Sequence, residues 1–307
     1  MSFKRVQGQE RALQILRGIL SRGNIPSALL FAGPEGVGKA LTAHEFAKTL
    51  LCRTRLSPAR ACGSCPDCVS IDKAIHPDVK NVNALYQASL REEDPAKQKT
   101  LRIETIRHLR KDMELVSMLG NWKIAIVEQA HTLEIEAANA LLKILEEPLP
   151  ETLWILTSSQ KERIPKTVLS RCCAIPFAPL PGKIVEDILV KNGIDQPRAA
   201  AIAKLCEGSL SPALKLHETE YPSCLTRDPL AAADSLPREL YLARTQVELA
   251  LFALSQDLRL RHLNGLLAFG RVERPLREID FLRQALRANA DPRTVMMLAC
   301  LEAQKVS

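Results

Sequence analysis

The fold of this 307-residue chain is decided by the stretch Leu29-Leu30-Phe31-Ala32-Gly33-Pro34-Glu35-Gly36-Val37-Gly38-Lys39-Ala40. It combines a short apolar run, a glycine-rich turn and the start of a helix. The spacing Gly-x-x-x-x-Gly-Lys is typical of a phosphate-binding loop, in which backbone N–H groups surround phosphate oxygens and the lysine adds a positive charge. A helix that starts after the lysine directs its positive dipole end at the same anion. The predicted nucleotide-binding residues are Gly33, Gly36, Gly38 and Lys39.

One position of this loop departs from the usual pattern. The pattern ends in Ser or Thr, whose hydroxyl binds Mg²⁺, whereas this chain has Ala40. Thr42 lies two residues further on and is out of register on the helix. The sequence therefore predicts a nucleotide site without one of its functional groups, and it leaves open whether ATP still binds.

Composition and charge are those of an ordinary globular protein, with 46% apolar and 25% charged residues. A net charge of +7 permits a polyanionic partner such as DNA without requiring one. Aromatic residues make up only 4%, which argues against stacking platforms for single-stranded nucleic acid. Residues 1–6 contain no apolar segment of signal-peptide length, and no apolar run approaches the roughly 20 residues of a membrane span. We therefore expect a cytoplasmic protein.

Four of the nine cysteines are clustered in the sequence. Two overlapping C-x-x-C steps share a middle cysteine, and a fourth cysteine stands just upstream. Thiols of a cytoplasmic protein are reduced or metal-bound rather than disulfide-linked. Four thiolates suit a tetrahedral zinc site, whereas a redox pair needs only two. The sequence thus predicts a closed structural zinc site, with buried free thiols as the alternative, at Cys52, Cys62, Cys65 and Cys68.

The remaining pattern predicts an α/β region followed by an all-helical one. Continuous apolar runs are typical of buried parallel strands, whose ligands lie at their carboxyl ends. Strands are predicted over residues 28–31, 123–131, 153–156 and 174–177, and helices over 9–23, 41–51, 101–117 and 134–147. Residues 87–99 lack a core pattern and are predicted as a surface loop. After the linker marked by Pro176, Pro179 and Pro181, only helical patterns occur.

The end of the strand predicted at residue 123 bears on ATP hydrolysis. In phosphate-loop ATPases this strand end carries an Asp near Mg²⁺, and in many classes a Glu that polarises the attacking water follows it. Here the two positions are Glu128 and Gln129. Gln129 has no carboxylate, so it cannot act as a general base. Together with Ala40, this favours a protein without ATPase activity of its own.

Four motifs follow one another in a fixed order. They are the phosphate loop, the cysteine cluster, Ala138-Asn139-Ala140-Leu141-Leu142-Lys143-x-Leu145-Glu146-Glu147-Pro148 and Leu169-Ser170-Arg171-Cys172. The ordered set resembles the clamp-loader branch of the AAA+ proteins, and within it the subunits of the bacterial DNA polymerase III clamp loader. The resemblance is dense over residues 1–180 and thin beyond.

The resemblance implies a RecA-like AAA+ domain over residues 1–180, with an inserted zinc module at about 52–68. A small helical lid over 181–215 and a helical collar for oligomerisation over 216–307 would follow. It also implies a hetero-oligomeric ring that loads a sliding clamp onto primed DNA in replication, with gamma/tau and delta subunits as partners and no membrane. The Ser-Arg-Cys motif of this family carries an arginine that reaches the neighbouring subunit's ATP, and this residue is Arg171 here. For a lone arginine, a surface ion pair is the ordinary alternative.

Two functions are compatible with these motifs. In the first, the chain is a non-hydrolysing stator subunit of the clamp loader; in the second, it is an ATP-hydrolysing motor subunit of gamma/tau type. Residues 208–214 match a lid motif in which motor subunits carry an arginine near the position of Ser211. Ala40, Gln129 and Ser211 together favour the first function. A zinc-dependent nucleic-acid-binding module is a weaker third possibility, because the cysteines lack a basic and aromatic surround.

Overall fold

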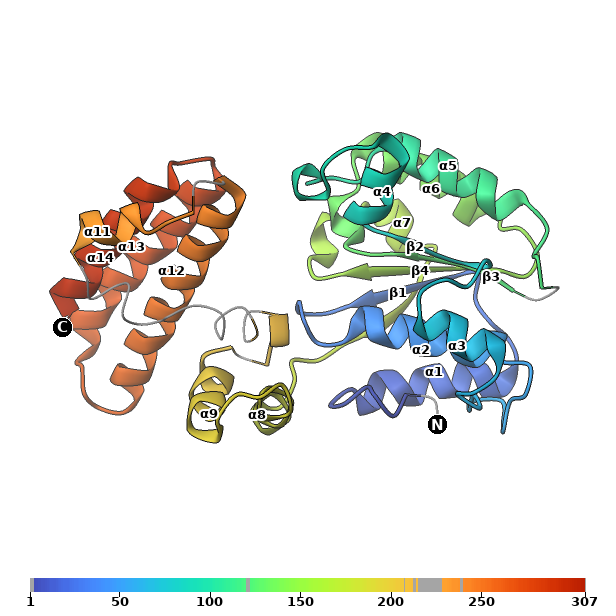
Figure 1. The fold of residues 1–307 in the computed structure, drawn as a ribbon, viewed down its shortest axis with the longest axis horizontal. Helices are drawn as coiled ribbons and strands as arrows, with labels where there is room; N and C mark the ends of the chain where they lie inside the picture. The colour runs from blue at the N-terminus through green and yellow to red at the C-terminus, as the bar shows by residue number, and fades with distance from the viewer. Residues whose placement is uncertain are drawn as a thin grey trace. The chain divides into compact units, whose positions relative to one another are not determined.

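The computed structural model of the protein describes residues 3–119, 122–206, 208–211, 214, 228–237 and 240–306. The chain forms two compact units, Met1–Ile184 and Val185–Ser307. Within the described ranges, the strands all belong to the first unit and the second is helical (Figure 1). The predicted succession of an α/β domain and an all-α region is confirmed. The finer division at residues 180 and 215 stays a prediction, and its second boundary lies outside the described residues.

The first unit is built on a five-stranded parallel sheet in the order β2-β3-β4-β1-β5. Its strands are β1 (Ala28–Ala32), β2 (Val79–Val82), β3 (Lys123–Val127), β4 (Thr152–Ser158) and β5 (Cys173–Pro176). Leu156 of β4 pairs with Leu30 of β1 on one side and with Val127 of β3 on the other. All residues of β3 and β4 are buried, as expected for central parallel strands covered on both faces.

Helices cover both faces of this sheet (Figure 1). One face carries α1 (Glu10–Arg22), α2 (Lys39–Leu51) and α3 (Pro66–Asp72), and the other carries α5 (Ile103–Glu114) and α6 (Ile135–Glu146). The shorter helices α4 (Ala84–Arg91) and α7 (Lys166–Leu169) complete the unit. A large apolar core lies between the sheet and α5 and α6, where Trp154, Ile106 and Leu141 are almost fully buried.

Two elements of the α/β unit, the helix α4 and the edge strand β2, are not apparent from the sequence. The surface loop predicted over residues 87–99 is wrong at its start, because α4 continues to Arg91. Asn83 caps this helix by accepting a hydrogen bond from the Tyr86 N–H at 3.1 Å. Gln87 is buried, and its Oε1 accepts from the Arg102 N–H and the Thr105 hydroxyl. α4 has no apolar pattern in the sequence because the polar Gln87 takes a core-facing position. β2 has only four residues, too few to show a strand periodicity.

The bounded helices that the structure describes after the sheet are α8 (Gly182–Lys191), α9 (Gln196–Leu205), α11 (Pro229–Asp234), α12 (Leu240–Leu263), α13 (Phe269–Arg287) and α14 (Pro292–Val306). The last four share an apolar core of their own, in which Val247, Leu251 and Ile279 are fully buried. This core lets the C-terminal helices pack without support from the sheet. None of the helices described here combines the length and apolarity needed to cross a bilayer.

Candidate nucleotide and metal sites

The phosphate loop joins β1 to α2 at the carboxyl end of the sheet. Gly36 and Gly38 have φ angles of 73° and 91°, a region that glycine reaches without steric cost. α2 begins at Lys39, so its N-terminus faces the loop. The structure therefore brings the four predicted residues, Gly33, Gly36, Gly38 and Lys39, into one loop at the N-terminus of α2.

Gly33 lies where the loop passes close to the segment after β5. Its N–H donates to the Ser158 carbonyl at 3.2 Å, and a Cβ at this position would lie 2.2 Å from the Phe177 carbonyl oxygen. We expect Gly33→Ala to force the two segments apart and to lower the free energy of unfolding by about 1–3 kcal/mol. Urea denaturation would measure the loss. Gly182→Ala is the control, since a Cβ there meets no atom within 4 Å, and equal stability of the two variants would contradict the prediction.

The Lys39 side chain folds back onto the loop. Its Nζ donates to the Gly33 carbonyl at 2.8 Å and also to the Pro34 carbonyl. Burial lowers the pKa of Lys39 to about 8, and the negative charge of Glu35 opposes this shift. The ammonium group is therefore held by the loop itself, next to the backbone that would surround a phosphate.

The Thr42 hydroxyl does not take the place of the missing Mg²⁺ ligand at Ala40. The Thr42 hydroxyl donates to the Gly38 carbonyl at 2.7 Å, and the residue is fully buried. It is committed to the backbone of α2, so Thr42 does not substitute for the absent group.

Glu128 and Gln129 follow β3, but the predicted strand over 123–131 ends earlier, at Val127. Burial raises the pKa of the Glu128 carboxyl, and a hydrogen bond with Asn83 opposes the shift. Gln129 is exposed, has a left-handed backbone with φ of 50°, and donates its N–H to the Thr157 hydroxyl at 3.3 Å. The strand end thus offers a half-buried carboxyl at position 128 and an exposed amide at position 129.

His131 is a neighbour of the phosphate loop that sequence reasoning missed. Its Nδ1 lies 3.3 Å from the hydroxyl of Ser158, at the end of β4. Its pKa is lowered by burial and then by the positive charges of Arg163 and Lys39. This lowered pKa favours the neutral form of the imidazole beside the loop. No sequence motif identifies His131, because it comes close to Ser158 only through the pairing of β3 with β4 in the sheet.

Arg171 lies between α7 and β5, the strand at one edge of the sheet. Its Nη1 donates to the Thr167 carbonyl at 2.9 Å, and its Nη2 lies 2.6 Å from Oε1 of Glu146. About a third of the side chain, 35%, stays exposed. Exposed ion pairs of this kind contribute little to stability, so the pair alone does not account for an arginine here.

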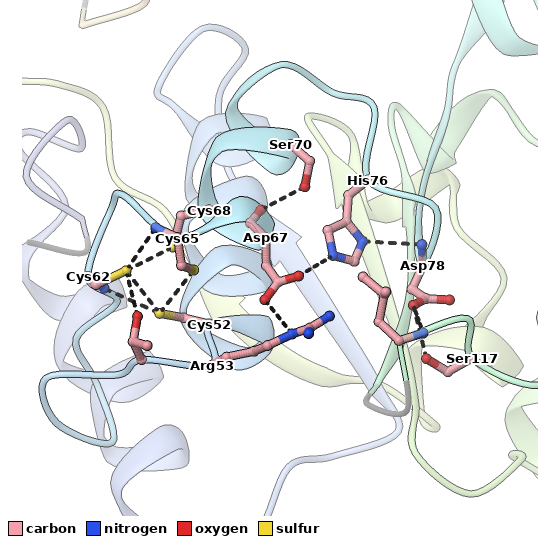
Figure 2. Close-up of polar contacts among 12 residues, drawn as sticks. Cys52, Arg53, Cys62, Cys65, Asp67, Cys68, Ser70, His76, Asp78 and Ser117 are labelled. Carbon is pink, nitrogen blue, oxygen red and sulfur yellow. Dashed lines mark hydrogen bonds and ion pairs between the residues drawn. The ribbon is translucent and has the colours of Figure 1, made fainter.

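The four predicted cysteines converge between α2 and α3 (Figure 2). The Sγ atom of Cys52 lies 3.6 Å from that of Cys62 and 3.9 Å from that of Cys65, and Cys62 and Cys68 are 3.9 Å apart. A disulfide would require about 2.05 Å. Four sulfurs at about 2.3 Å from a zinc ion form a tetrahedron with edges of about 3.8 Å. The cluster therefore has the dimensions needed to bind a metal ion.

Hydrogen-bond donors surround the Cys62 sulfur. It accepts from the Thr54 hydroxyl at 3.1 Å and from the N–H groups of Cys65 at 3.2 Å and Ser64 at 3.4 Å. These donors, Thr54 first, lower the pKa of Cys62 to about 5. The thiolate is the form that binds metal. A set of four sulfurs leaves no open position for water, which is typical of a structural site.

A polar chain connects the cysteine cluster to β2 (Figure 2). The buried Asp67 carboxylate contacts Nε of Arg53 at 3.0 Å and Nε2 of His76 at 3.6 Å. His76 in turn accepts a hydrogen bond from the Asp78 N–H at 3.2 Å through its Nδ1. The Asp78 carboxylate accepts from the Ser117 hydroxyl at 3.0 Å, in the loop before β3. The cysteine cluster is thus connected to the start of β2 and to the loop before β3.

Known proteins support the assignment that the motifs indicate. The family model described as DNA polymerase III, delta subunit matches residues 8–181. The tau subunit of DNA polymerase III from Escherichia coli K12 is 33% identical over 221 residues, which cover 70% of this chain and 32% of that protein. The delta′ subunit from Pseudomonas aeruginosa PAO1 is 35% identical over 193 residues, which cover 62% and 55%. The chain thus spans about a third of one relative and about half of the other.

The fold has a solved counterpart in a DNA polymerase III gamma-subunit-related protein from Thermotoga maritima. The two share a TM-score of 0.54 at 16% sequence identity, over 96% of this chain and 100% of that one. This likeness concerns the fold alone. The family match, in contrast, covers more than half of the sequence and contains the phosphate loop, the cysteine cluster and Arg171. The chain therefore belongs to the DNA polymerase III delta-subunit family, in the clamp-loader branch of the AAA+ proteins.

Proposed function

We propose that the chain is a delta-prime-type stator of the DNA polymerase III clamp loader, without ATPase activity of its own. The relatives include both delta′ and tau subunits, so kinship alone does not choose between stator and motor. The observation that carries the proposal is a glycine-rich loop at the N-terminus of α2 that lacks the Mg²⁺-binding hydroxyl, together with a strand end that lacks a catalytic base. Ala40 and Gln129 are the two residues concerned.

Phosphoryl transfer requires a bound Mg²⁺ and a positioned water. The Thr42 hydroxyl, two residues after Ala40, already donates to the Gly38 carbonyl at the start of α2. Glu128, the one carboxyl at the end of β3, has its pKa raised by burial, which disfavours its charged form. Ser211 lies near the lid position where motor subunits carry an arginine, and it also favours the absence of hydrolysis. Its neighbours Pro212 and Ala213 lie outside the described residues. Together these features favour nucleotide binding without hydrolysis.

We expect the isolated protein to release no phosphate from ATP above background in the presence of Mg²⁺. The measurement is a steady-state phosphate-release assay with the Lys39→Ala variant as its control. Turnover that persists in this variant comes from a contaminating enzyme. Turnover that disappears with Lys39→Ala would instead assign hydrolysis to this chain and favour the alternative, a motor subunit of gamma/tau type.

In the proposed complex, α11 to α14 act as a collar that holds the subunit in a ring. Gamma/tau and delta subunits are the proposed neighbours, with the sliding clamp and primed DNA reached through the assembled complex. Support comes from the separate apolar core of these helices and from large apolar side chains that remain exposed, namely Phe281, Leu298 and Leu301. Such exposed groups are available for contacts with other chains.

Two further roles complete the proposal. Arg171 reaches the ATP of the adjacent subunit as an arginine finger, and the four cysteines hold one structural zinc ion. Neither role requires the chain to hydrolyse ATP. Both are testable by substitution, as argued in the Discussion.

A further inference from the structure

We infer that Glu146 is a positioning residue for Arg171, holding the guanidinium in the orientation in which it meets a phosphate on the neighbouring subunit. The inference rests on the proposed role of Arg171 as an arginine finger. It concerns a contact between two parts of the chain that are separated by 25 positions in the sequence and joined by a 2.6 Å ion pair.

The location of Glu146 is not explained by the helix that carries it. It is the last residue of α6, where the negative end of the helix dipole disfavours a carboxylate. Arg171 compensates this charge through its Nη2. The two backbones are held in place by the same apolar core, which contains Leu145 next to Glu146 and Val168 on α7. The carboxylate is therefore presented to the arginine from a rigid support.

The contacts of Arg171 orient its guanidinium without using all of its hydrogen-bond donors. A guanidinium has five N–H donors in one plane. Nη1 donates to the Thr167 carbonyl and lies 3.5 Å from the Ser170 hydroxyl, while Nη2 contacts Glu146. Among the contacts described for this side chain, Nε makes none. Two anchored nitrogens fix the plane of the guanidinium, and 35% of the side chain stays exposed.

Such an arrangement matters because an arginine side chain has many rotamers. Ordering a rotamer-rich side chain at the moment of binding has a cost, and donors that are preorganised stabilise developing charge best. A guanidinium already held by Glu146 and Thr167 needs less reorganisation when a phosphate of another chain arrives. Glu146 would therefore affect the rate of the step and not the affinity for ATP.

The test uses the reassembled clamp loader with clamp and primed DNA. The other ATP sites are disabled by substitution of their phosphate-loop lysines, so that only the site beside this subunit turns over. We expect Glu146→Ala to lower kcat at that site by about 3- to 10-fold, with KM for ATP unchanged. Glu147→Ala, one residue further on, is the matched control and should leave both constants unaltered. Glu146→Asp, which keeps the carboxylate, should recover part of the loss.

A double-mutant cycle separates positioning from a structural role. In the Arg171→Ala background, Glu146→Ala should cause no further loss, because the group it orients is gone. A loss that persists in this background would show that Glu146 acts through α6, and would overturn the inference. If Arg171→Ala lowers turnover strongly while Glu146→Ala leaves kcat intact, only the role of Glu146 is wrong. If Arg171→Ala itself has no effect, the proposed arginine finger is wrong as well.

Discussion

Replacing Arg171 by alanine in the assembled ring is expected to lower ATP turnover at the adjoining site by about 10³- to 10⁵-fold, the range known for arginine fingers. The physical reason is that the planar fork supplies two parallel donors to the charge that develops on the γ-phosphate. Total turnover of a ring with several sites would fall by much less. The measurement is therefore made on complexes in which only the site next to this subunit is active.

Two further variants test whether the loss comes from the shape of the guanidinium or from the loss of a positive charge. Arg171→Lys keeps the positive charge but loses the fork, so its turnover should stay close to that of Arg171→Ala. Lys166→Ala, which removes an exposed cation from the same short helix, should leave turnover unaltered. Normal turnover and clamp loading by an intact Arg171→Ala complex would show that Arg171 has no role beyond its surface ion pair with Glu146. Failure of the complex to assemble would make Arg171 a structural residue.

Purified protein is expected to contain about one zinc ion per chain, and Cys65→Ser to lose it. Cys65 is the N-cap of α3 and one of four converging sulfurs, so its loss opens the site and releases the loop between α2 and α3. Because metal-binding energy of such sites is folding energy, the free energy of unfolding should fall by about 4 kcal/mol or more. Elemental analysis and urea denaturation measure the two effects.

The control for this experiment is Cys173→Ser, which changes an exposed thiol on β5, outside the cluster. It should retain the metal and its stability. A chelator applied to the unsubstituted protein should reproduce the behaviour of Cys65→Ser. The chain from Asp67 through His76 to Asp78 predicts that metal loss also reaches the loop before β3, where hydrogen exchange of the Met118 N–H should accelerate. A Cys65→Ser protein with full zinc content would refute the assignment.

Local sequence patterns were sufficient for much of the fold and for the composition of both candidate sites. The glycine spacing after residue 32 predicted the loop, because each position depends on backbone angles set within a few residues. The cysteines were recognisable for a similar reason, since four ligands within 17 residues have little freedom to lie far apart. The buried strands β1, β3 and β4 were visible as apolar runs, because both of their faces are covered.

The remaining features depend on contacts between distant parts of the chain, and only the tertiary structure decided them. The placement of β5 beside β1 brings the Phe177 carbonyl against Gly33. The strand order likewise sets His131 beside the phosphate loop, and the packing of α7 against α6 joins Arg171 to Glu146. Such contacts follow from how whole elements pack, and no spacing or periodicity in the sequence records them. The amino-acid sequence by itself therefore determined which chemical groups each site contains, whereas the packing of helices on the sheet determined what those groups contact.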